Sequence, residues 1–339
     1  MNLTRADQIA KAVLYEGYML YPYRPSSVKN RQRWNFGVLY APAFSDLQGG
    51  EEACSMRNEF LVCGNAGTTL EMKLRFLHLQ TRSAQVSSRS QSALPAAWQE
   101  AVEREVSLPD LRPEKLCREP LQHTFEFASG TQVDPEHDSD GEAVGEIVRR
   151  QEAIRGTIDI SAEAIAKDLY KIGVIVRNAT PLETCPSTSR DEALLRSLVS
   201  THTILGVEGG EFVSLLEPPD DLQELAKQCQ NVGAWPVLVG DAGQRDTLLA
   251  SPIILYDYPQ IAPESAGDLF DGTEIDEILS LRIMTLTDDE KSEIRQSDTR
   301  ARQILERTDA MPVEQFMKLH GVVRGLRLLP VPPPREDLP

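Results

Sequence analysis

The first 21 residues have the spacing of apolar side chains that is typical of a helix. Apolar side chains recur every three or four positions across the first 21 residues, and polar side chains fall mostly on the opposite side. This period is typical of a helix with one apolar face. Thr4 suits the N-cap position, and Pro22 moves Tyr21 out of helical geometry. We therefore predict a helix over residues 4–21, followed by a loop and then by a strand at 34–40.

Alternating patterns replace the helical one between residues 57 and 180. Five segments alternate at least partly between apolar and polar side chains: 58–64, 69–82, 123–130, 153–163 and 170–180. This period is that of strands with one buried face. Because no long helix separates the segments, they favour an antiparallel sheet or sandwich over a parallel one. The polar stretches 83–95 and 129–146 are expected to be exposed or mobile interruptions.

Helical signals return after residue 185. Ser189 and Glu192 form a capping box, which predicts the start of a helix. A short hairpin or strand pair around Gly209-Gly210 is expected next. The rest of this half is predicted to hold a short helix at 220–230, a strand at 235–241 and helices at 274–284 and 288–307.

These patterns predict an α+β fold, with a mainly antiparallel β-sheet or sandwich flanked by N-terminal and C-terminal helices. A length of 339 residues is typical of about two domains. The interpretation divides the chain into an N-terminal helix plus antiparallel β unit at 1–185 and a mixed α/β unit with C-terminal helices at 186–328. Residues 329–339 are expected to be an extended proline-rich tail.

The composition excludes several classes of protein. With 52 acidic residues against 35 basic ones, the formal net charge is −17, which weighs against nucleic-acid binding. No apolar stretch approaches the roughly 20 residues needed to span a bilayer, so we expect no membrane insertion. Five cysteines without a C-x-x-C pair argue against a disulfide framework or a zinc knuckle. The first 20 residues lack the apolar core and cleavage site of a secretory signal, so we expect a cytoplasmic protein. Nucleotide-binding and hydrolase motifs are absent, and we expect no cofactor.

Basic residues nevertheless gather near the start of the chain. Residues 1–35 carry six lysines and arginines against two acids, a local net charge of +4. The loop after residue 20 mixes cations with aromatic side chains, in the order Tyr21, Tyr23, Arg24, Lys29 and Arg31. Such a loop could bind a carboxylate, a phosphate or an acidic partner surface. The alternative is that these cations pair with the protein's own surplus acids.

A second candidate surface lies near residue 260. Tyr256, Asp257, Tyr258 and Glu264 fall in a proline-interrupted loop, where aromatic hydroxyls and carboxylates could contact a partner. The acidic stretch 264–293 follows, with a local net charge of −8.

The same stretch could supply oxygen ligands for a hard cation, from Asp268, Asp271 and Glu274. Their spacing does not match an EF-hand, so we expect a solvated or partner-binding acidic face rather than a metal site.

Two segments carry a resemblance. VLYEGYMLYPYRPSSVKNRQRWNFGVLY and SPIILYDYPQIAPESAGDLFDGTEIDEILSLRIMTLTDDEK resemble an uncharacterised accessory protein family of actinobacterial-type, oxygen-tolerant [NiFe]-hydrogenase gene clusters. The resemblance implies a cytoplasmic helper in hydrogenase maturation or assembly that acts by protein contact. It brings no catalytic residues with it.

The sequence therefore favours a non-enzymatic accessory or assembly protein, with hydrogenase subunits or maturation factors as its expected partners. The alternative is a metal-assisted hydrolase or transferase that uses the acidic residues between 264 and 277.

Overall fold

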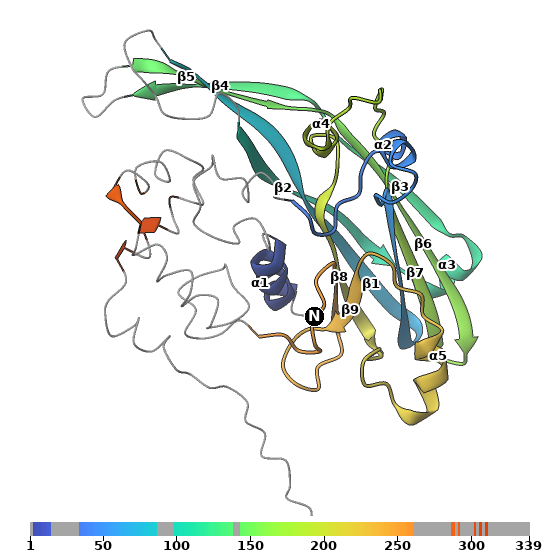
Figure 1. The fold of residues 1–339 in the computed structure, drawn as a ribbon. Helices are drawn as coiled ribbons and strands as arrows, with labels where there is room; N and C mark the ends of the chain where they lie inside the picture. Colours follow the sequence, from blue (N-terminus) through green and yellow to red (C-terminus); the bar gives the residue numbers. More distant parts are fainter. Residues whose placement is uncertain are drawn as a thin grey trace, which may run out of the picture.

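A single antiparallel sheet dominates the protein (Figure 1). The computed structural model describes residues 3–14, 34–86, 98–137 and 143–260, together with 286–288, 291, 302, 305, 306, 309 and 310. Its ten strands pair antiparallel throughout, with a main order of β3-β6-β7-β1-β8-β10-β9. The predicted α+β, mainly antiparallel class is confirmed. The strands are β1 Ser55–Val86, β2 Trp98–Leu111, β3 Leu121–Phe127, β4 Gly130–His137, β5 Ala143–Gln151, β6 Ile154–Ala166, β7 Leu169–Asn178, β8 Val199–Phe212, β9 Trp235–Leu238 and β10 Thr247–Ser251.

Strand β1 is the central strand of this sheet and pairs with four others. It merges two of the predicted strands into one of 32 residues, which pairs with β7 and β2 along its length and also with β8 and β5. Since β8 and β10 lie beyond residue 185, strands from both predicted units belong to the same sheet.

The pleat of β1 sends alternate side chains to two different cores. Phe60 and Phe76 point into the main core, where the Phe76 ring lies 5.9 Å from that of Phe125 on β3, centroid to centroid. Leu77 and Leu79 point to the other face and pack against Tyr40 and its neighbours. Both faces of the sheet are therefore covered.

Short helices cover parts of these faces. α1 (Leu3–Leu14) lays Ala6, Ile9, Ala10 and Val13 on β8 and β10, on the face opposite the main core. It confirms the first two-thirds of the predicted helix, and residues 15–21 lie outside the described ones. The other helical elements are α2 Pro42–Leu47, α3 Pro113–Arg118, α4 Arg190–Leu194, η2 Asp220–Leu222 and α5 Gln223–Lys227.

The predicted capping box at the start of α4 is confirmed. The Glu192 amide donates to the Ser189 hydroxyl, and the Ser189 amide donates to a Glu192 carboxylate oxygen at 2.9 Å. The two side chains thereby satisfy backbone donors that have no partner within the helix.

Two local predictions were wrong, and a third was wrong in part. Residues 34–40 form no strand, and only Leu39 bridges to Leu198. The polar stretch 129–146 is mostly exposed where it is described, as expected, but it does not interrupt the sheet, because it contains β4 and the start of β5. Gly209 and Gly210 do not close a hairpin, because β8 runs straight through them. A Cβ on Gly210 would lie 2.6 Å from the Cys63 carbonyl oxygen, so this glycine permits close strand approach rather than a turn.

Candidate functional site: an exposed apolar surface beside strand β9

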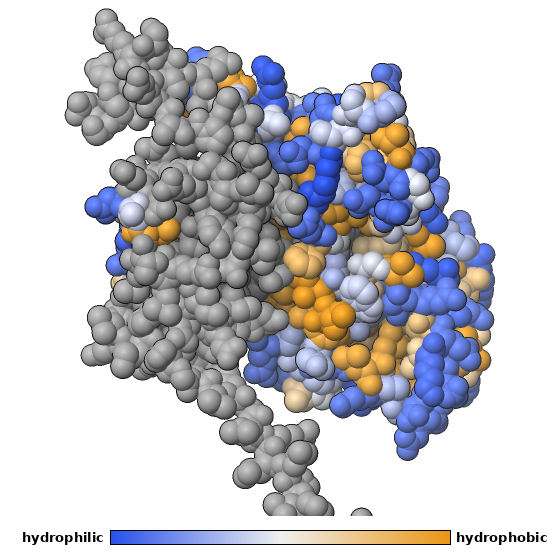
Figure 2. Space-filling model, viewed as in Figure 1, coloured by the Kyte–Doolittle hydropathy of each residue, from blue (hydrophilic) through white to orange (hydrophobic). Residues whose placement is uncertain are grey.

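Most of the large apolar side chains that are exposed in the described chain lie in one part of the sequence. Of eight such side chains, five lie between residues 216 and 256. We call these five the apolar surface: Leu216, Val232, Trp235, Ile254 and Tyr256. Tyr256 is 86% exposed and Ile254 is 75% exposed. Figure 2 shows hydrophobic residues gathered over the region of β9 and the segment that follows β10.

Hydrogen bonds hold together the segments that carry this surface. Asp257 accepts from the Ser214 hydroxyl at 2.5 Å and from the Leu238 amide at 2.8 Å, which ties residues 252–258 to β9 and to the end of β8. The Tyr258 amide donates to the Leu238 carbonyl at 2.7 Å. Val232 exchanges two backbone bonds with Arg57 on β1. The apolar surface therefore stands on a fixed backbone.

The structure divides the second predicted binding group into different roles. Of the members that the structure describes, Tyr256 is exposed to solvent, whereas Asp257 has the internal partners just described. Tyr258 packs against the main core and has a positive φ of 58°. Glu264 lies outside the described residues, as do the basic loop (Tyr21, Tyr23, Arg24, Lys29 and Arg31) and the acidic candidates Asp268, Asp271 and Glu274.

Acidic side chains follow Leu216 of the apolar surface in the sequence. Glu217 follows Leu216 directly, and its amide donates to the Ser214 hydroxyl that also contacts Asp257. Asp220 and Asp221 begin the next helical turn, and all three carboxylates are exposed. Residues 211–260 hold eight acidic residues against Lys227 and Arg245, a local net charge of −6. We call Glu217, Asp220 and Asp221 the acidic rim.

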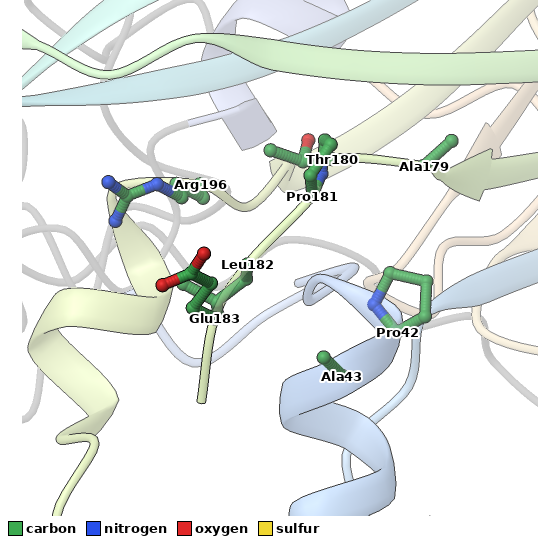
Figure 3. Close-up of a pocket in the computed structure, with 8 residues that line it drawn as sticks. All are labelled: Pro42, Ala43, Ala179, Thr180, Pro181, Leu182, Glu183 and Arg196. Atoms are coloured by element: carbon green, nitrogen blue, oxygen red, sulfur yellow. The ribbon is translucent and has the colours of Figure 1, made fainter. Parts of the chain in front are cut away.

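A separate pocket of about 740 Å³ opens beside α2 (Figure 3). In that view Arg196 and Glu183 lie across the pocket from Pro42 and Ala43. Arg196 pairs with Glu152 at 2.9 Å, and Thr180, which also lines the pocket, is hydrogen-bonded to backbone groups of β6. This lining mixes apolar side chains with the charged side chains of Arg196 and Glu183. It offers no pairing of a nucleophile with a base.

One serine–histidine pair has the geometry of a nucleophile and its base. The Ser251 hydroxyl lies 3.2 Å from His202 Nε2, and His202 Nδ1 lies 2.7 Å from the Ser200 carbonyl oxygen. Burial lowers the pKa of His202 to about 4, so the ring is neutral at pH 7. Both side chains are fully buried, which denies a substrate access. We interpret the pair as a hydrogen-bonded part of the core, and no spacing in the sequence indicated it.

Metal ligands do not cluster in the described part of the chain. No group of three or more histidine, cysteine, aspartate or glutamate side chains there could hold an ion. All five cysteines are free in the structure.

Comparison with known proteins adds no identification. No protein-family model matches the sequence, and no curated protein matches it with significant similarity. In the described residues, every helix is too short or too polar to cross a membrane.

Proposed function

We propose that this protein is a non-enzymatic accessory protein that binds a partner protein through its apolar surface. The observation that carries the proposal is the exposure of Ile254, Tyr256 and Trp235 on a backbone that Asp257 fixes. Clusters of exposed apolar side chains mark interaction sites, and tyrosine and tryptophan dominate binding energy at such sites. A preformed backbone lowers the ordering cost of association.

The proposal extends to the identity of the partner and to the compartment. The resemblance of residues 13–40 and 251–291 to hydrogenase accessory proteins supports a cytoplasmic role in the maturation or assembly of a [NiFe]-hydrogenase. The apolar surface overlaps the second of these segments, because Ile254 and Tyr256 belong to it. Hydrogenase subunits and maturation factors are therefore the first partners to test.

Affinity purification from the native host tests this function. The tagged full-length chain is compared with an Ile254→Ser/Tyr256→Ser variant, and Leu47→Ser/Val133→Ser serves as the matched control because those residues are exposed apolar ones on other elements. We expect the wild type and the control to recover a hydrogenase subunit or maturation factor, and the Ile254/Tyr256 variant to lose it. Equal recovery by all three proteins would exclude the apolar surface. Recovery of no hydrogenase component would exclude the proposed partner.

A further inference from the structure

The acidic rim defines the chemistry of the partner, an inference that rests on the proposed function. Within the described residues no cation forms an ion pair with Glu217, Asp220 or Asp221. Elsewhere the protein pairs many of its carboxylates, as at Glu100 with Arg149. Among the residues that the structure describes, the rim therefore presents negative charge that no cation neutralises.

This charge argues against a second copy of the chain as the occupant. A two-fold symmetric contact places the same patch of both subunits face to face. Two acidic rims would then meet, and juxtaposed like charges disfavour association. The apolar surface is thus poorly suited to self-association through a symmetric interface.

The rim also argues against an anionic membrane and against nucleic acid. Cytoplasmic membrane surfaces carry negative potential and attract basic, not acidic, protein surfaces. Phosphate backbones are bound by lysine and arginine in the same way. Among occupants that could cover exposed leucine, isoleucine, tyrosine and tryptophan, a protein surface with basic residues around an apolar centre has the matching charge.

We infer that the apolar surface binds a basic amphipathic segment of the partner protein. The segment places apolar side chains against Ile254, Tyr256 and Trp235, while its lysines and arginines face Glu217, Asp220 and Asp221. The apolar contacts supply most of the affinity, and the charges select the partner and accelerate association. Each exposed ion pair changes affinity by about twofold, so three pairs change it by about tenfold.

Designed peptides test this inference on the full-length protein. Three labelled 18-residue helical peptides share one leucine face and differ only at their polar positions, which are all lysine, all glutamine or all glutamate. Binding is measured by fluorescence anisotropy at low and at high salt. We expect the lysine peptide to bind about tenfold more tightly than the glutamine peptide, and the glutamate peptide to bind least. High salt should remove most of the difference.

Two sets of variants separate the rim from the overall negative charge. The rim variant is Glu217→Gln/Asp220→Asn/Asp221→Asn. Its matched control neutralises three exposed acids on other elements, Glu51→Gln/Asp110→Asn/Glu119→Gln. We expect the rim variant to lose about tenfold in affinity for the lysine peptide and the control to lose less than twofold. Equal losses in both would overturn the inference, because they would reflect net charge alone.

The remaining outcomes distinguish failure of the inference from failure of the proposed function. The lysine and glutamine peptides could bind equally well, and Ile254→Ser/Tyr256→Ser could weaken both. This result would refute the basic partner and support the apolar surface as a docking site. Binding that is unchanged by Ile254→Ser/Tyr256→Ser would remove both. Binding to phosphatidylserine vesicles that this variant abolishes would replace the protein partner with a membrane.

Discussion

Replacement of Asp257 tests whether one carboxylate fixes the apolar surface. The two carboxylate oxygens of Asp257 accept hydrogen bonds from the Ser214 hydroxyl and from the Leu238 amide. Leu238 is buried, with 2% of its surface exposed. Asp257→Ala removes both acceptors and leaves a buried backbone donor without a partner. Asp257→Asn is the matched variant, because its amide oxygen can accept from Leu238 while its NH₂ group donates to the Ser214 oxygen.

The expected cost follows from the number and kind of these bonds. A hydrogen bond to a charged group contributes about 1.5–3 kcal/mol, and Asp257 is partly exposed, which favours the lower end of that range. Two such bonds predict that Asp257→Ala lowers the free energy of unfolding by about 3–4 kcal/mol. Asp257→Asn keeps two neutral bonds and should lower it by about 1 kcal/mol.

Urea unfolding measures the total effect, and hydrogen exchange of the Leu238 and Tyr258 amides measures the local one. We expect both amides to exchange faster in Asp257→Ala, because they pair Leu238 with residues 257 and 258. Asp257→Ala should also weaken binding of the lysine peptide, because Tyr256 loses its fixed position. A loss of less than about 0.5 kcal/mol, or equal losses in Ala and Asn, would refute this account of Asp257.

Three further predictions concern the fold. Phe76→Ala should lower the free energy of unfolding by about 3–5 kcal/mol, measured by urea titration, because it empties a fully buried site beside Phe125. Ser189→Ala should cost about 1 kcal/mol in the same assay, and Ser189→Thr should retain most of the cap. The folded-state pKa of His202 is about 4, below its unfolded value of about 6.5, so stability is full above pH 6.5 and falls as the pH drops toward 4. His202→Gln should reduce that slope by about 1.4 kcal/mol per pH unit, and an unchanged slope would contradict the assignment.

The sequence predicted those strands whose alternation is plain, and it missed those in which acidic residues interrupt it. The apolar residues of β1 from Leu70 to Leu79 indicated a strand directly. Strand β2 was missed because Glu100 and Glu103 belong to a residue type that is depleted in strands. Their carboxylates pair across the sheet, Glu103 with Arg75 at 2.9 Å and Glu100 with Arg82 at 3.3 Å. These contacts are long-range, so no local pattern contained them.

The candidate site shows the same division. Tyr256 was identified from its place in an aromatic, proline-interrupted loop, and it is indeed exposed. The role of Asp257 depends on Ser214 and Leu238, which lie 43 and 19 residues away in the sequence. Trp235 was assigned only to a strand, because its exposure at the sheet edge depends on the order of the strands. Local sequence can name a candidate, but the sheet decides which candidates face solvent.

The structure shows which charged side chains of this protein of net charge −17 are paired and which acids have no described cation partner. Many basic side chains of the sheet pair with acids on neighbouring strands, as Arg149 does with Glu100 and Asp134. A cation in such a pair contributes little to the field outside the protein. The acidic rim follows β8, and among the described residues no cation pairs with Glu217 or Asp221. Part of the surplus negative charge, that of the acidic rim, therefore follows Leu216 of the apolar surface, and there it can select a basic partner.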